Sequence, residues 1–287
     1  MIVIAAFNNL LTLRIKKSYI RAKKYFEIKI LIKNTFQGIN PLKYEFEKML
    51  PHELEEAVAR MPVAYVPWGA LEWHGPHLPV GLDAIKAHEL CLRIASTAGG
   101  GVVLPPCHIS HDTMPFPWTF KYPVSIVRRA LWATLQQLEA SGFRAILVIT
   151  GHYPATQVLL FITLAELFMV SHRAAVAACP EFFAALEKGY YGDHAALWET
   201  SILMYLFPNL VDLEQLRIKS KNKIFGLFRS GVMGKDPLRH ASPELGKEIV
   251  DYMVARFSEL ARELAERPNK QTACRFHRDV IRRFVKP

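Results

Sequence analysis

From about residue 60 onward, short apolar runs alternate along this chain with longer segments of helical periodicity. The plainest run, Ala145–Thr150, is long enough for a buried strand and too short for a helix. The other runs are Val63–Pro67, Val102–Leu104 and Ala174–Cys179. The predicted helices are Asp83–Thr97, Val124–Ser141, a helix ending at His172, Glu199–Phe207 and Ser242–Arg267. This alternation predicts an α/β fold with a mostly parallel sheet covered on both faces.

The size and cysteine content of the chain limit its class. With 287 residues, 51% of them hydrophobic, it can bury one large core, alone or with an appendage. The four cysteines are widely spaced and form no Cys-x-x-Cys pair. This spacing argues against a cysteine-based zinc site and against a disulfide framework, so we expect a cytoplasmic protein.

The positive charge of the chain is concentrated at its two ends. Residues 1–48 carry ten Lys or Arg against three Glu, and residues 268–287 carry six against one Asp. The rest is near neutral, unlike a dedicated nucleic-acid binder, and Met1–Leu13 is too short to span a bilayer. We therefore predict a basic N-terminal extension (1–48) that need not belong to the fold, a body (49–267) and a basic C-terminal tail (268–287). An alternative is that these ends bind a membrane or nucleic acid.

One loop carries three potential metal ligands. Glu72 and His74 are two residues apart, so in extended backbone they point to the same side. Gly and Pro residues then force a turn that can bring Asp83 back toward them. Such ligands suit zinc, manganese or iron, although a lone Glu-x-His is more often a polar surface loop.

Further polar residues follow the later strands. His152 comes just after Ala145–Thr150, and the segment Gly192–Ser201 places Asp193 and His194 ahead of Glu199. In parallel sheets, ligands bind outside the carboxyl ends of the strands, where such residues meet. The sequence therefore predicts a metal site at that edge.

Together these segments resemble the creatininase (creatinine amidohydrolase) family over roughly residues 50–215. The specific part is Glu-x-His-Gly-x-His-Leu-Pro followed by Asp83. The resemblance implies a three-layer α/β/α sandwich, a metal-dependent hydrolase of amide-like carbon–nitrogen bonds and a homo-oligomer, commonly a hexamer. It also implies that Glu72 and His152 hold one metal ion, that His74 holds a second, and that Asp83 bridges the two.

The chain departs from the family pattern at several positions. Creatininase carries a further metal-ligating glutamate where this chain has Pro154, which cannot ligate. Glu199 is a candidate replacement, with the alternative that it is a helix N-terminal carboxylate favoured by the dipole. Trp118 replaces the glycine of a Phe-Pro-Gly-Thr turn, and Leu197 replaces a common acidic residue.

The resemblance also suggests roles for other residues. One or two divalent ions, zinc most of all, activate water for attack on the substrate carbonyl. His194 is the candidate proton donor to the leaving nitrogen, oriented by Asp193. Tyr153, Trp118 and Trp198 are candidate walls for a small planar substrate, although single aromatic residues more often belong to the core.

We therefore expect a metal-dependent amidohydrolase acting on a small cyclic amide, formamide or peptide-like substrate, with no membrane or nucleic-acid partner. The alternative is a catalytically impaired relative that serves as a binding or assembly subunit. The changes at Pro154 and Leu197 favour the alternative. The intact residues that argue against it are Glu72, His74, Asp83, His152 and His194.

Overall fold

The structure is a computed structural model that describes residues 43–220, 230–266 and 269–284. Its centre is a four-stranded sheet in the order β2-β1-β3-β4, with every neighbouring pair parallel. The strands are β1 (Val63–Trp68), β2 (Val102–Val103), β3 (Ala145–Thr150) and β4 (Ala175–Pro180). This pairing confirms the parallel sheet predicted from the apolar runs, and every strand residue is buried.

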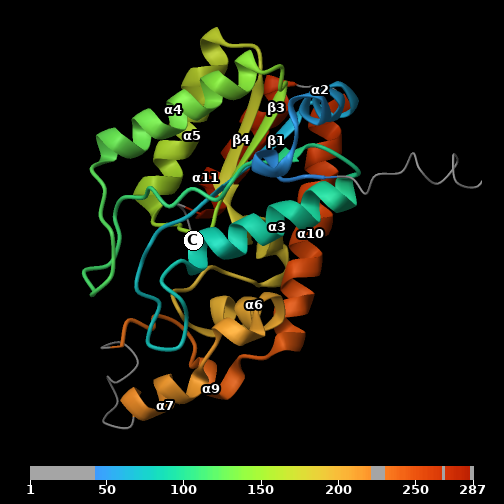
Figure 1. Ribbon diagram of the computed structural model, residues 1–287. Helices are drawn as coiled ribbons and strands as arrows, with labels where there is room; N and C mark the ends of the chain where they lie inside the picture. Colours follow the sequence, from blue (N-terminus) through green and yellow to red (C-terminus); the bar gives the residue numbers. More distant parts are fainter. Residues whose placement is uncertain (1–42, 221–229, 267–268, 285–287) are drawn as a thin grey trace, which may run out of the picture. The chain divides into compact units, whose positions relative to one another are not determined.

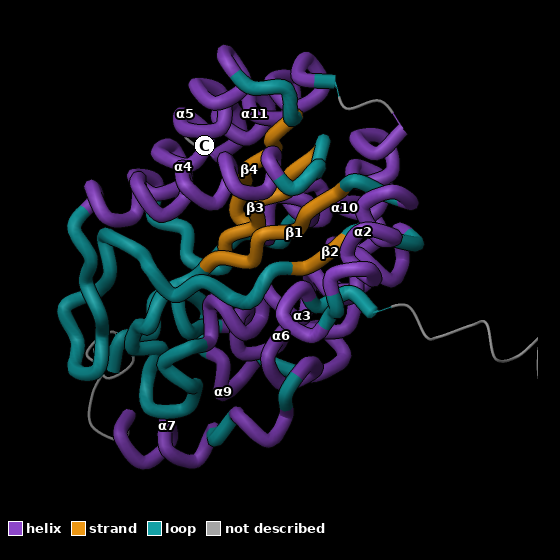
Figure 2. The backbone as a smooth tube through the Cα atoms, turned by 45° about the horizontal axis from the view of Figure 1, so that its top comes forward, coloured by secondary structure: helices purple, strands orange, loops and turns teal. Residues whose placement is uncertain are grey.

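Helices cover both faces of the sheet, and this confirms the predicted α/β sandwich (Figures 1 and 2). One layer contains α3 (Leu82–Ala98), α6 (Leu197–Leu206) and α10 (Pro243–Glu266), and the other contains α4 (Val124–Ala140) and α5 (Ala155–Ser171). The smaller elements are η1 (Phe46–Lys48), α2 (Pro51–Arg60), η2 (Glu181–Lys188), η3 (Pro208–Leu210), α7 (Leu213–Ser220) and α9 (Pro237–His240).

The helix boundaries follow from local sequence. α3 ends at Gly99, whose φ of 87° is the left-handed conformation that a helix C-terminus commonly uses. On α4, Val127, Leu131, Leu135 and Leu138 recur at helical spacing and form its buried face. No helix in the described ranges is long and apolar enough to cross a membrane.

Both basic ends contact the fold more than the charge pattern predicts. Val103 donates a backbone hydrogen bond to Tyr44 (2.7 Å), so the last residues of the predicted extension pack on β2. The rest of the extension, 1–42, lies outside the described residues.

The predicted C-terminal tail is not free of the fold, because it forms α11 (Lys270–Phe284). α11 packs on β4 and places Ala273 and Val280 in the core. His277 is fully buried and accepts a hydrogen bond from the Ala178 N–H at 3.0 Å. α11 thus covers the outer edge of β4. Charge alone did not reveal this, because the apolar residues occupy only one face of the helix.

Candidate metal centre

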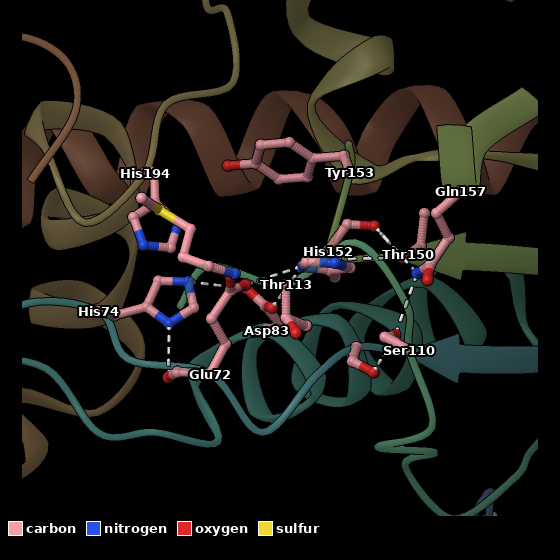
Figure 3. A network of polar contacts seen from close by, with 12 residues as sticks. Glu72, His74, Asp83, Ser110, Thr113, Thr150, His152, Tyr153, Gln157 and His194 are labelled. Carbon is pink, nitrogen blue, oxygen red and sulfur yellow. Dashed lines mark hydrogen bonds and ion pairs between the residues drawn. The ribbon is translucent and has the colours of Figure 1, made fainter. Parts of the chain in front are cut away.

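The candidate ligands come from three loops at the carboxyl ends of the strands. The loop after β1 carries Glu72 and His74, and Asp83 lies in the first turn of α3. His152 comes two residues after the end of β3, and Glu199 lies in the first turn of α6. Figure 3 shows Glu72, Asp83 and His152 pointing toward one another, with His194 beside His74. The structure therefore brings the predicted ligand residues together.

Two glycines allow Asp83 to reach this position. A Cβ atom on Gly151 would lie 2.2 Å from the carbonyl oxygen of Asp83, and one on Gly69 would lie 2.2 Å from the nitrogen of Ala84. No side chain fits at either place. The start of α3 therefore packs directly against the ends of β1 and β3, which places the Asp83 carboxylate between the two ligand loops.

Asp83 faces two imidazoles with its two oxygens. Its Oδ1 lies 3.1 Å from His74 Nε2, and its Oδ2 lies 3.3 Å from His152 Nδ1. Glu72 Oε2 is 2.9 Å from the same His152 nitrogen, and Glu199 Oε2 is 3.6 Å from His74 Nε2. The geometry thus defines two ligand groups that share Asp83, namely Glu72–Asp83–His152 and His74–Asp83–Glu199.

Backbone carbonyls set the orientation of both imidazoles. His74 Nδ1 lies 3.0 Å from the Glu72 carbonyl oxygen, and His152 Nε2 lies 3.0 Å from the His111 carbonyl oxygen. A carbonyl only accepts hydrogen bonds, so these nitrogens are the donors. The other nitrogen of each neutral ring then aims a lone pair at carboxylate oxygens. Lone pairs and anions facing one another need a cation between them.

The residues present fit a divalent ion on a second ground. Glu72 Oε2 and Asp83 Oδ2 are buried and accept no hydrogen bond among the described residues. Buried carboxylate oxygens left in this state are strongly unfavourable unless they bind a cation. A donor set of two imidazoles and three carboxylates suits zinc or manganese.

When no ion is bound, protons on the two imidazoles supply part of this positive charge. Burial lowers the pKa of His74, but Asp83 and Glu199 outweigh burial and raise it to about 9. Burial likewise lowers the pKa of His152, and Asp83 and Glu72 together raise it to about 10. Burial raises the pKa of Asp83, but the two imidazoles outweigh burial and hold it well below its usual range.

His194 lines the same pocket, but Asp193 does not orient it as predicted. His194 Nε2 lies 2.9 Å from the Trp73 carbonyl oxygen, to which it donates. The Asp193 carboxylate instead accepts the backbone N–H groups of Trp198 (2.8 Å) and Glu199 (3.2 Å). It caps the N-terminus of α6, a role that its place just before that helix favours. Burial, followed by nearby His74, lowers the pKa of His194, so its ring is neutral.

The predicted substrate walls are only partly placed at the pocket. The pocket has a volume of about 340 Å³, and Tyr153 lines it together with Met114, Pro154 and Met233. Trp118 is 76% exposed and does not line it. Trp198 packs edge-on against Tyr190, with ring centroids 5.3 Å apart, and is also absent from the lining.

Two charged residues behind the site were missed in the sequence. Lys86 and Glu181 are buried, and Lys86 Nζ forms ion pairs with both Glu181 and Glu199. Burial raises the pKa of Glu181 to about 7, against the opposing effect of Lys86. Glu181 follows β4 directly, which is the same strand-end signal that identified His152. Lys86 stands one turn after Asp83 in an otherwise apolar helix face.

Comparison with known proteins identifies the family. The family model described as creatinine amidohydrolase (creatininase) matches residues 47–261, most of this chain. The chain belongs to the creatininase family. Membership makes it a metal-dependent amidohydrolase that acts on carbon–nitrogen bonds other than standard peptide bonds, as the sequence predicts.

Individual relatives agree with this assignment. Creatinine amidohydrolase of Pseudomonas putida is 24% identical over 177 residues, which span 54% of this chain and 68% of that protein. A crystal structure of creatinine amidohydrolase (creatininase) superposes with a TM-score of 0.66 at 21% identity, covering 77% of this chain and 97% of that one. The putative creatinine amidohydrolase of Bacteroides fragilis gives a TM-score of 0.62 at 24% identity, covering 78% and 97%.

Other solved creatininase structures of this fold are named for their contents. One is described as a manganese form, one as a Zn-Zn type of a glutamate-to-glutamine variant, and one as a variant complexed with creatine. They are 21% to 23% identical to this chain, so the likeness itself shows the shared fold.

Proposed function

We propose that this protein hydrolyses a carbon–nitrogen bond of a small amide with the help of two divalent ions. Glu72, Asp83 and His152 would hold one ion, and His74, Asp83 and Glu199 would hold the other. The observation that carries the proposal is Asp83, whose two oxygens face His74 Nε2 and His152 Nδ1, the ring nitrogens that no backbone carbonyl holds. The manganese and Zn-Zn forms of the creatininase neighbours support the choice of ions.

Glu199 is proposed as a ligand because of where its oxygens lie. Creatininase has a further ligating glutamate at the position of Pro154, and here Glu199 supplies a carboxylate oxygen beside His74 instead. The dipole interpretation also holds in part, since Glu199 lies in the first turn of α6 and accepts the Ala195 N–H at 2.7 Å. The oxygen that accepts this N–H, Oε2, is also the one that faces His74, and its second lone pair can bind an ion, so both roles are compatible.

His194 is proposed to move the proton in the reaction. Divalent ions in such a site lower the pKa of water and polarise the substrate carbonyl. His194 is neutral and lines the pocket, and because the Trp73 carbonyl holds its Nε2–H, the lone pair is on Nδ1. This nitrogen can accept the proton of the attacking water and pass it to the leaving nitrogen. The Trp73 carbonyl, rather than Asp193, keeps the ring in this orientation.

The pocket supports a small substrate, and the change at Pro154 favours one other than creatinine. Its volume of about 340 Å³ is near the lower limit of small-molecule sites, and Met114, Pro154 and Met233 contribute apolar lining. Creatininase presents a carboxylate at the position of Pro154, and the pocket of this chain lacks it. We therefore favour a lactam, formamide or cyclic ureide. The experiment is ion analysis of the purified protein, followed by a hydrolysis screen of these three classes after metal removal and after addition of Zn²⁺ or Mn²⁺.

The outcome of this screen separates the two functional candidates. Hydrolysis that disappears with chelator and returns with the metal supports the enzyme. A protein that binds no ion and hydrolyses none of these substrates is the catalytically impaired relative instead, and the proposal is then wrong.

We also propose that the protein is a homo-oligomer. α5 is apolar on nearly all sides, yet it exposes Leu167 (55%) and Val170 (82%). A helix that is apolar all round is expected to be covered on every side. Light scattering of the purified protein tests this. A mass equal to one chain at micromolar concentration would contradict it.

A further inference from the structure

A fully buried lysine stands directly behind the candidate metal centre. Lys86 lies on α3 one turn after Asp83 and is 1% exposed. Its Nζ pairs with Glu199 Oε1 and, at 2.8 Å, with Glu181 Oε1. The same nitrogen lies 4.9 Å from the centre of the Tyr153 ring. A buried ammonium group is strongly unfavourable without such partners, so their arrangement around Lys86 indicates a specific use.

The contacts of Lys86 divide the two oxygens of Glu199 between different tasks. Oε1 is occupied by Lys86 and by the Tyr153 hydroxyl at 2.7 Å. Oε2 accepts the Ala195 N–H at 2.7 Å and faces His74 Nε2 at 3.6 Å. One oxygen is thus turned away from the pocket and the other toward the His74–Asp83–Glu199 group. A carboxylate held in this way can offer only one oxygen to an ion.

Glu181 keeps Lys86 in place from the other side. It is 2% exposed, begins η2 immediately after β4, and uses Oε1 for the ion pair with Lys86. Its Oε2 is buried and accepts no hydrogen bond among the described residues. Lys86 is therefore the contact through which this buried carboxylate is tied to the site.

We propose that Lys86, held by Glu181, is a positioning residue that fixes Glu199 as a one-oxygen ligand for the ion at the His74–Asp83–Glu199 group. The inference rests on the proposed function, because it assumes that ions bind at this centre. Lys86 stands outside the Glu72–Asp83–His152 group, so the ion there keeps its ligands without it. Removal of Lys86 should therefore lower the affinity for one ion and leave the affinity for the other unchanged.

The test measures ions rather than turnover. Lys86→Met is compared with the wild type by Zn²⁺ titration in a calorimeter and by the visible absorption of the Co²⁺-loaded protein. We expect the affinity for one ion to fall about 10–100-fold, as for other residues that orient metal ligands, with the other unchanged. The Co²⁺ spectrum should change for that ion alone, which a general loss of stability would not produce.

Four further variants complete the test. Lys247→Met removes an exposed lysine on α10 that pairs with Asp251, and it should bind both ions as the wild type does. Glu181→Gln keeps the volume and should weaken the same ion to a smaller extent, which decides the matter if Lys86→Met does not fold. Adding Lys86→Met to Glu199→Gln should weaken that ion no further than Glu199→Gln alone, because Lys86 acts through Glu199.

The possible failures are distinct. Two wild-type ions with unchanged affinities in Lys86→Met and Glu181→Gln overturn the role of Lys86 and leave the proposed function intact. If the wild type binds only one ion, the affinity for that ion must fall in Lys86→Met. An unchanged affinity overturns the inference. A wild type that binds no ion overturns the proposed function and this inference together.

Discussion

At the scale of the residue, each candidate ligand at this centre depends on a neighbour that sets its orientation. The carbonyls of Glu72 and His111 orient the two imidazoles. The Met114 N–H donates to Glu72 Oε1, which leaves Oε2 to face His152. Such partners hold ligands in the conformation that an ion requires, so substitutions should act on ion binding before they act on folding.

Asp83 should be the residue on which both ions depend. Asp83→Asn retains the shape of the side chain but removes the shared charge, so the bound ion content should fall from two per chain toward none. Elemental analysis after dialysis measures this. Asp112→Asn is the matched control, because Asp112 also lines the pocket but hydrogen-bonds Thr156 instead of a ligand. Full ion content in Asp83→Asn would contradict the bridging role.

His194 should affect the reaction without affecting the ions. His194→Gln removes the neutral imidazole, and we expect kcat for the substrate found by the screen to fall about 10²–10⁴-fold. Ion content should stay at the wild-type value. Because His194 lies within ligand distance of Glu72 and His74, loss of an ion would show instead that it is a metal ligand.

At the scale of the element, α11 protects the outer edge of the sheet. An edge strand exposes unpaired N–H groups, and here His277 accepts the one from Ala178. Accepting that bond requires a lone pair on Nε2, so His277 must be neutral for α11 to dock in this way. Burial lowers the pKa of His277 to about 4.

The stability of the fold should therefore decrease as the pH is lowered through a defined window. Below the unfolded-state pKa of about 6.5, the unfolded chain binds a proton that folded His277 excludes down to about pH 4. The free energy of unfolding is therefore undiminished by this group above pH 6.5. It falls by up to about 3 kcal/mol as the pH falls to 4. Urea unfolding of the wild type and His277→Gln at pH 7 and pH 5 measures it.

Gln retains an acceptor for the Ala178 N–H but does not titrate, so it serves as the matched control. The stability advantage of the wild type over His277→Gln should shrink as the pH falls. An advantage that is equal at both pH values would show that His277 is not the titrating group. Glu166 is near His277 Nδ1, at 3.4 Å, and Glu166→Gln checks its contribution.

At the scale of the whole domain, the centre joins elements from both halves of the sheet. The candidate ligands follow β1 and β3 and begin α3 and α6, so an ion bound there would tie together four segments that are distant in sequence. Without an ion, several carboxylates remain close to one another in a buried space. The folded form therefore gains stability from any ion that the unfolded chain does not bind.

Removal of metal should lower the melting temperature. At an ion concentration 100-fold above Kd, each bound ion stabilises the fold by about 2.7 kcal/mol. A thermal scan with Zn²⁺ or with chelator measures the shift, which should be several degrees for a domain of this size. Asp83→Asn should melt at the same temperature in both conditions. Equal melting temperatures for the wild type with and without Zn²⁺ would contradict binding at this centre.

The order of the elements could be read from the sequence because each depends on local periodicity. Val63–Pro67 and Ala145–Thr150 were predicted as strands from their apolar runs and lie within β1 and β3. The three ligand segments could be predicted as neighbours because parallel strands end at the same edge. Their roles as metal ligands remain proposals.

Only the tertiary structure decided the contacts made between distant segments. Asp193 caps α6 and does not orient His194. α11 covers β4 and is not a free tail, and Trp118 is exposed and does not line the pocket. Lys86 and Glu181, 95 positions apart in the chain, meet behind Glu199. Periodicity and spacing describe neighbours along the chain. The partner of a buried charge or a backbone N–H depends on which remote group packs beside it, and no local pattern records that.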